Sequence, residues 1–207
     1  MRILRQTVAL VLCIVAVSGC SKSLKQLGYE GFGRDEWQQP ERVIEVLAIQ
    51  PGSKVADLGS GSGYFTFDLA EATGPDGIVY AVDVDPDMIE LVGDLAREKG
   101  ATNVTTVLAS SDDPGLPDGE IDLVFTSNTY HHIENPSAYF ERLKRDLAPG
   151  ARVAILDLRP DAGWLQQWLG HSTDVEKIRA EMKQAGYTVE DEQDFVEKQS
   201  FLIFIAS

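Results

Sequence analysis

Cysteine and histidine are scarce in this chain of 207 residues. The only two cysteines, Cys13 and Cys20, lie ahead of the stretch that has the composition of a folded domain. That stretch therefore has no material for a disulfide framework, a zinc cluster or a cysteine nucleophile. Three histidines, of which His131 and His132 are adjacent, give little scope for a metal site, and we expect no metal.

Positive charge is scarce as well. The formal net charge is −15, and it becomes −17 without the first nineteen residues, whose charged side chains are Arg2 and Arg5. Such a surface repels phosphate backbones, so we expect no nucleic-acid partner. The composition, 43% hydrophobic and 25% charged, is that of one ordinary globular domain with a core.

The chain has no apolar run as long as a transmembrane helix. Its longest apolar run has the pattern of an export signal. Arg2 and Arg5 precede an uninterrupted apolar run of ten residues, 8–17. At about 1.5 Å per residue this run spans roughly half of a ~30 Å hydrocarbon core. It is short for a transmembrane helix and typical of a signal peptide.

The end of this run resembles the lipobox of bacterial lipoproteins. Val17-Ser18-Gly19-Cys20 places a cysteine directly after small residues, and the resemblance implies that Cys20 becomes the lipidated first residue of the mature chain. We expect a signal peptide at 1–19, a tether at 20–33 and one domain at 34–207. The protein would be anchored on the extracytoplasmic side of a bacterial membrane, in the periplasm or at the cell surface. An uncleaved anchor and an ordinary signal peptide are the alternatives.

The domain is organised around a glycine turn. Residues 55–58 form a short apolar stretch typical of a buried strand, and Gly59, Gly61 and Gly63 follow it before a run that starts a helix. Three glycines at the carboxyl end of a strand favour close approach of the backbone to a small ligand. A tight turn without a ligand is the alternative.

Strands and helices alternate along most of the domain. Helices are predicted at 34–49, 64–72, 86–99, 136–147 and 174–184, and strands at 55–58, 78–83, 104–108, 121–127, 152–157, 188–195 and 201–206. The alternation predicts an α/β fold with a mainly parallel sheet and helices on both faces. The last two strands have no helix between them, so the last one should pair antiparallel at or near an edge.

Asp83 ends the second predicted strand, twenty residues beyond Gly63. Because open parallel sheets bind ligands beyond the carboxyl ends of their strands, this carboxylate is placed to accept hydrogen bonds from both hydroxyls of a ribose. The G-x-G-x-x-G pattern of dinucleotide-binding proteins fails in both registers, since Tyr64 and Thr66 stand where the last glycine belongs. No lysine or arginine occurs at 55–96 to meet a pyrophosphate. A ligand with a ribose and without phosphate fits these residues better.

Several stretches occur in the order seen in one enzyme family. They are VADLGSGSGYFT, VYAVDVDPDMIE and IDLVFTSNTYHHI, followed by the terminal strand pair. Together they resemble the class I S-adenosylmethionine-dependent methyltransferases over roughly residues 34–207. The resemblance implies a Rossmann-like fold with a mainly parallel seven-stranded sheet and an antiparallel C-terminal strand.

The resemblance also implies a set of contacts to S-adenosylmethionine as the cofactor. The glycine turn would pass beneath its methionine part, Asp57 would lie near its amino group, Asp83 would hold the ribose and Val84 would touch the adenine. Ser110 stands where many members carry an aspartate that meets the adenine. The full set of expected cofactor residues is Asp57, Gly59, Ser60, Gly61, Gly63, Asp83, Val84, Ser110 and Asn128.

A catalytic base is needed only where the methyl acceptor must lose a proton. The segment after the fourth strand is its expected place, and a histidine titrates in the useful range. Because consecutive residues leaving a strand point opposite ways, we expect at most one of the two adjacent histidines to face the site. Resemblance to small-molecule methyltransferases favours His132 over His131. The alternative is that both only pack locally, and His171 is either a pocket residue or a neighbour of a helix cap.

The expected activity is methyl transfer to a small-molecule acceptor, whose apolar character stays open. Trp164 and Trp168 would line an acceptor pocket, lie on a membrane surface or pack in the core. S-adenosylmethionine is made in the cytosol, whereas a lipobox implies an extracytoplasmic face. A non-catalytic lipoprotein that binds S-adenosylmethionine or another nucleoside is therefore the alternative function. The missing third glycine disfavours a nicotinamide-dependent oxidoreductase.

Overall fold

The computed structural model describes residues 34–162 and 172–206. The predicted signal peptide, the tether, Cys20, Trp164, Trp168 and His171 lie outside these residues. Among the helices that are described, none is long and apolar enough to cross a bilayer.

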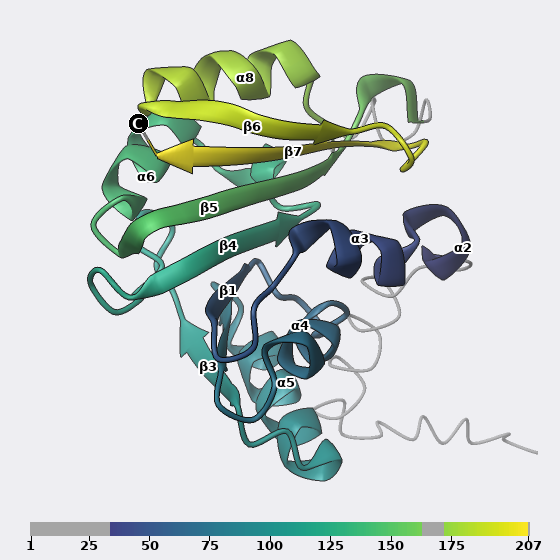
Figure 1. Ribbon diagram of the computed structural model, residues 1–207, viewed down its shortest axis with the longest axis vertical. Helices are drawn as coiled ribbons and strands as arrows, with labels where there is room; N and C mark the ends of the chain where they lie inside the picture. The colour runs from purple at the N-terminus through teal and green to yellow at the C-terminus, as the bar shows by residue number, and fades with distance from the viewer. Residues whose placement is uncertain (1–33, 163–171, 207) are drawn as a thin grey trace, which may run out of the picture.

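A seven-stranded sheet forms the centre of the domain (Figure 1). Its strands are β1 (Lys54–Leu58), β2 (Ile78–Asp83), β3 (Val104–Leu108), β4 (Ile121–Ser127), β5 (Leu147–Leu158), β6 (Tyr187–Gln193) and β7 (Gln199–Ala206), in the order β3-β2-β1-β4-β5-β7-β6. The first five pair in parallel, and β7 lies antiparallel to both β5 and β6. Figure 1 shows the arrows of β4 and β7 running in opposite directions. The predicted mainly parallel sheet with an antiparallel C-terminal strand is confirmed.

Helices cover both faces of this sheet. They are α2 (Arg34–Gln38), α3 (Pro40–Leu47), α4 (Thr66–Thr73), α5 (Pro86–Lys99), α6 (Pro136–Leu143) and α8 (Val175–Gln184), with short 3-10 turns η1 (Tyr130–His132) and η2 (Pro160–Ala162). Alternate residues of β5 point to opposite faces. Val153 and Ile155 join one apolar cluster with residues of α6 and α8, while Ala154 and Leu156 join another with residues of α3 and α4.

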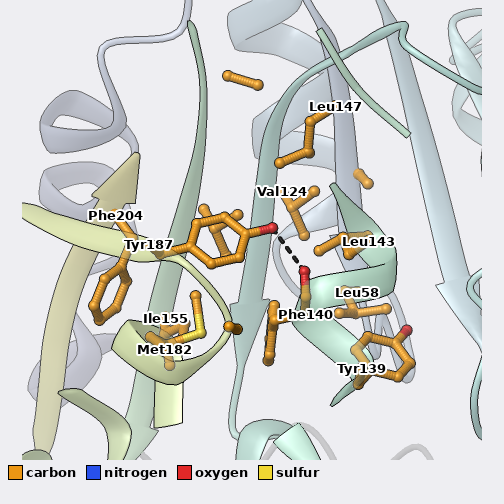
Figure 2. Packing of buried hydrophobic residues seen from close by; sticks show 14 of the residues in the cluster. Leu58, Val124, Tyr139, Phe140, Leu143, Leu147, Ile155, Met182, Tyr187 and Phe204 are labelled. Carbon is orange, nitrogen blue, oxygen red and sulfur yellow. Dashed lines mark hydrogen bonds between the residues drawn. The ribbon is translucent and has the colours of Figure 1, made fainter. Parts of the chain in front are cut away.

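The first of these clusters contains one buried hydrogen bond among its apolar contacts. Figure 2 shows the Tyr187 hydroxyl donating to the backbone oxygen of Phe140, at 2.9 Å. Met182 of α8 and Ile155 of β5 pack beside the tyrosine ring in the same view. This contact joins α6 to the amino end of β6.

The helices predicted at 34–49 and 136–147 differ most from the structure, and those predicted at 64–72 and 174–184 differ by one or two residues at their ends. Residues 34–49 form two helices rather than one, because Gln39 adopts φ +51° ahead of Pro40, and a proline disfavours the helical conformation of the residue before it. The helix predicted at 136–147 ends at Leu143. Leu147 instead starts β5 and pairs with Ile121, and a register shift in the pairing of β4 with β5 follows.

The order of the strands creates one natural ligand-binding edge. From β1 the chain passes to β2 and β3 on one side, whereas β4 and β5 lie on the other side of β1. Where the order reverses, the connections leave the carboxyl ends of β1 and β4 in opposite directions and open a crevice. The residues that follow β1, β2 and β4 meet at this crevice.

Candidate functional site

The turn after β1 leaves no space for a side chain at its first residue. Gly59 has φ +76°, and a Cβ built on it would lie 2.1 Å from Thr129 Oγ1 in the segment after β4. Gly61 and Gly63 also have positive φ, at +52° and +85°. The amides of Gly59 and Ser60 both donate to the backbone oxygen of Val82, at 2.8 and 3.0 Å. The turn is therefore held between the ends of β2 and β4, and its first position requires glycine.

Asp83 is fixed by this turn. Its Oδ2 accepts a hydrogen bond from the Gly61 amide at 2.8 Å, and its Oδ1 accepts one from the Asp85 amide at 2.9 Å. The side chain is buried but lines a cavity. Each carboxylate oxygen can accept a second hydrogen bond, so Asp83 can receive two hydroxyl donors from a ligand.

Two cavities meet at the glycine turn. The larger, of about 550 Å³, is lined by Asp83, Val84 and Ser110, and the smaller, of about 400 Å³, by Asp57, Tyr64 and His131. Both are lined by Gly59, Asn128, Thr129 and His132. Val84 is 60% exposed and presents an apolar side chain to the larger cavity. Together the cavities can hold one elongated ligand that crosses the turn.

Asp57 lies under the turn and carries an unusual charge environment. Its Oδ2 accepts a hydrogen bond from Thr66 Oγ1 at 2.6 Å. Burial raises the pKa of Asp57 to about 6, with a smaller contribution from the charge of Asp83, while the Thr66 hydrogen bond and Arg34 act in the opposite direction. The smaller cavity therefore contains a carboxyl group whose ionised form a nearby cation would stabilise.

Arg34 supplies a positive charge on the same cavity. Its guanidinium lies 3.7 Å from the centre of the Tyr64 ring, a cation–π arrangement, and its side chain bonds to Gln38. Burial lowers the pKa of Arg34 from its usual value, and the charges of Tyr64 and Asp57 act against this. The first turn of α2 thus contributes to the wall of the smaller cavity.

Asn128 borders both cavities and adopts φ +54°. Its Oδ1 accepts a hydrogen bond from Gln199 Nε2 at 2.7 Å, and Gln199 Oε1 accepts one from Gln38 Nε2 at 3.0 Å. Gln38 and Gln199 are both buried. These three amides connect α2, β7 and the end of β4, and they hold Asn128 in its left-handed conformation.

Both adjacent histidines line the smaller cavity, so the expectation that only one would face the site is wrong. The alternation of side chains ends with β4, and Tyr130–His132 form a 3-10 turn in which consecutive side chains are not opposed. The two rings lie with their centres 4.1 Å apart. His131 Nδ1 is 2.9 Å from Asp157 Oδ1 at the end of β5.

A family model described as a methyltransferase domain matches residues 49–200. The chain belongs to the methyltransferase domain family. A solved structure of an S-adenosylmethionine-dependent methyltransferase from Aquifex aeolicus superposes on this domain with a TM-score of 0.82, at 24% identity, over 89% of this chain and 98% of that one. This likeness confirms the predicted Rossmann-like methyltransferase fold.

Curated relatives are methyltransferases of several kinds. An aklanonic acid methyltransferase from a Streptomyces species is 29% identical over 135 residues, which make up 65% of this chain and 60% of that protein. A ubiquinone/menaquinone biosynthesis C-methyltransferase from Shewanella frigidimarina is 30% identical over 116 residues, 56% of this chain and 46% of that protein. The chain spans about half the length of the curated relatives it matches.

The structure of this methyltransferase domain brings together every predicted site residue that it describes except Gly63, which lies further along the turn and packs near Phe67 and Val92. Ser110 lines the larger cavity, where its Oγ donates to Asp112 Oδ1 at 2.9 Å. Sequence reasoning missed Arg34, Gln199 and Asp157. The reasoning that identified Asp83 applies to Asp157 as well, because both residues lie at or next to the carboxyl ends of parallel strands.

Proposed function

We propose that this protein transfers the methyl group of S-adenosylmethionine to a small-molecule acceptor, and that a lipid on Cys20 anchors it on the extracytoplasmic side of a bacterial membrane. The observation that carries the enzymatic proposal is the position of Asp83. Its carboxylate is held by the glycine turn through Gly61 and also lines the larger cavity. Membership of the methyltransferase domain family supports the same activity.

The residues of the two cavities fit this cofactor. Asp83 can accept the ribose hydroxyls, and Val84 offers an exposed apolar side chain to the adenine. Asp57 offers a carboxyl group to the amino group of the methionine part, and Arg34 offers a positive charge to its carboxylate. Gly59 has no side chain and lines both cavities, so the ligand would cross from one cavity to the other over backbone atoms.

The bound cofactor supplies a methyl group that is already activated by a sulfonium. The protein's own contribution is therefore to orient the acceptor and exclude water. Phe65, Leu158 and Tyr64 give the smaller cavity apolar walls beside its charged groups. These walls favour an organic acceptor with an apolar part, in keeping with the small-molecule names of the two curated relatives.

Calorimetry on the full chain in detergent micelles tests whether the protein binds S-adenosylmethionine and whether Asp83 contributes to that binding. We expect S-adenosylmethionine and its demethylated product to bind in calorimetry, and Asp83→Asn to weaken binding by about 100-fold, since hydrogen bonds to a charged group contribute about 1.5–3 kcal/mol each. Asp118→Asn is the matched control, because Asp118 is exposed and pairs with Arg145 outside the site. Absence of binding by the unmodified chain refutes the proposal.

The lipid anchor is supported by the Val17-Ser18-Gly19-Cys20 sequence and has its own test. Cells that express the protein and are fed radiolabelled palmitate should label it, and Cys20→Ser should abolish the label and the partitioning into detergent. Partitioning that is unchanged in Cys20→Ser contradicts the anchor.

A second candidate is a lipoprotein that binds S-adenosylmethionine without catalysis. The lipobox-like sequence favours it, because an extracytoplasmic protein is separated from the cytosol where the cofactor is made. Tritiated methyl transfer into small molecules extracted from cells separates the two candidates. Binding without any labelled product favours the second.

A further inference from the structure

Asp157 is the last residue but one of β5, next to Leu158 in the wall of the smaller cavity, and the proposed cofactor contacts give it no role. Its side chain is fully buried, with 0% exposure, and Oδ1 lies 2.9 Å from His131 Nδ1. Within the described part of the chain, no group donates a hydrogen bond to Oδ2, which is buried as well. A buried carboxylate is destabilising unless a hydrogen-bonding or charged partner compensates it, and His131 is the partner that the structure provides.

This pairing fixes the ring of His131. A carboxylate oxygen accepts hydrogen bonds, so Nδ1 carries the proton in the neutral imidazole and Nε2 carries the lone pair. The side chain of His131 is 5% exposed and lines the cavity that also contains Asp57 and Ser60. His131 therefore combines a fixed orientation, a defined basic nitrogen and a place on the cavity wall.

We propose that His131 is the general base that removes a proton from the methyl acceptor, that Asp157 is its positioning residue, and that the acceptor group is the hydroxyl of a phenol or enol. The inference rests on the proposed methyl transfer. In the step, the acceptor O–H bond breaks and its proton passes to Nε2 of His131. The oxygen forms a bond to the methyl carbon while the carbon–sulfur bond breaks, and that electron pair stays on sulfur as a thioether.

Asp157 serves this step in two ways. Its hydrogen bond keeps the basic nitrogen on the side of the ring away from β5, and its negative charge stabilises the imidazolium that forms when the proton arrives. The imidazolium then releases its proton to solvent, which restores the base. His132 borders both cavities, which suits it to contact the ligand.

The acceptor class follows from which acidic groups are still protonated at neutral pH and can lose their proton to an imidazole. A carboxylic acid, with a pKa near 4, is already ionised at neutral pH and needs no base. A phenol, with a pKa of about 10, is mostly protonated there, yet lies within the range in which a histidine base assists proton loss during the reaction. The apolar side chains of Phe65 and Leu158 in the same cavity suit a ring that carries such a hydroxyl.

The first test measures the tautomer of His131 and needs no acceptor. The full chain contains three histidines, so nitrogen NMR of histidine-labelled protein in micelles can be assigned with His131→Gln and His132→Gln. With the demethylated cofactor product present, we expect neutral His131 to be protonated at Nδ1, and Asp157→Asn to shift it toward the Nε2-protonated form that imidazole prefers in water. Asp161→Asn removes an exposed carboxylate four residues further along the chain that pairs with Arg159, and it should leave the tautomer unchanged. An Nε2-protonated His131 in the unmodified protein overturns the proposal.

The second test measures the acceptor class with tritiated S-adenosylmethionine. The probes are 1-naphthol, 1-naphthoate, 1-naphthylamine and 1-naphthalenethiol, which share one ring system and differ in the reacting group. We expect label in 1-naphthol alone, and a loss of about 100-fold in kcat for His131→Gln with unchanged calorimetric affinity for the cofactor. Label confined to another probe, or no label from a protein that binds the cofactor, overturns the assigned acceptor. Failure to bind the cofactor is a different result, because it refutes the proposed function itself.

Discussion

Gly59→Ala is the sharpest test of how the glycine turn is built. The new Cβ would lie 2.1 Å from Thr129 Oγ1, 2.4 Å from its Cγ2 and 2.7 Å from its Cβ. The contact to the rigid Cβ means that rotating the threonine side chain cannot remove the clash. The substitution also places alanine at φ +76°, which costs about 1–2 kcal/mol for an L-residue with a side chain. Overpacking adds typically 1–3 kcal/mol.

We therefore expect Gly59→Ala to lower the free energy of unfolding by about 2–5 kcal/mol, measured by urea unfolding of the full chain in micelles. Gly52→Ala is the matched control, because Gly52 has a similar φ of +86° but its added Cβ would have no atom within 4 Å. The control should lose only the backbone contribution, about 1–2 kcal/mol. The difference between the two variants measures the contact with Thr129.

A double-mutant cycle separates the steric contribution further. Thr129→Gly removes the three atoms that would lie nearest to the alanine side chain, so the combination with Gly59→Ala should be less destabilising than the sum of the two single changes by at least 1 kcal/mol. Equal losses for Gly59→Ala and Gly52→Ala, together with simple additivity in the cycle, would show that the turn and the segment after β4 are not in the contact described.

Two further predictions concern buried polar groups of the site. Because the folded-state pKa of Asp57 is raised to about 6, the folded protein keeps a proton that the unfolded chain loses, so the contribution of Asp57 to stability falls as pH rises from about 4 to 6 and stays low above that. Asp57→Asn should remove this fall, and the unfolding free energies of the two proteins should diverge across that window by up to about 3 kcal/mol; parallel pH profiles contradict it. Gln199→Leu should destabilise the domain by about 1–3 kcal/mol in thermal or urea unfolding, because the buried Gln38 and the half-buried Asn128 each lose their hydrogen bond to Gln199. Gln50→Leu, which removes only an exposed local bond to Ala48, should change stability far less.

The regular elements of the parallel half were predictable because local signals agree there. Strands predicted at 78–83, 104–108 and 121–127 coincide with β2, β3 and β4. The helix predicted at 86–99 coincides with α5, where the Asp85 side chain caps the first turn by accepting from the Asp87 amide at 3.0 Å, and Gly100 ends the helix with φ +67°. Apolar pattern, cap and glycine all point to the same bounds.

The contacts that the sequence could not predict join distant parts of the chain through polar side chains. Gln38 and Gln199 are separated by 161 positions, and nothing local marks either amide as buried. Arg34 lines the smaller cavity from α2, which the left-handed Gln39 separates from α3 where one long helix was predicted. Such pairs are determined by how the elements pack, and a single sequence carries no separate signal for them.

Some side chains of the candidate site lie in strands and others lie beyond the strand ends, and the alternation of side chains applies only to the first group. Asp57 and Asp83 lie within strands and line the two cavities. The strand end indicated Asp83, whereas the place of Asp57 was implied by the family resemblance. His131 lies beyond the last residue of β4, in a 3-10 turn to which that alternation does not apply. The alternation led to the wrong expectation that at most one histidine would face the site, and the preference for His132 came from resemblance to other methyltransferases. Asp157, again within a strand, lies with Oδ1 2.9 Å from His131 Nδ1, and a carboxylate oxygen there places the proton of the neutral imidazole on Nδ1. Under the proposal made above, the residue that marks the base is thus a buried acid near a strand end, and the position of the histidine in its loop gives no such mark.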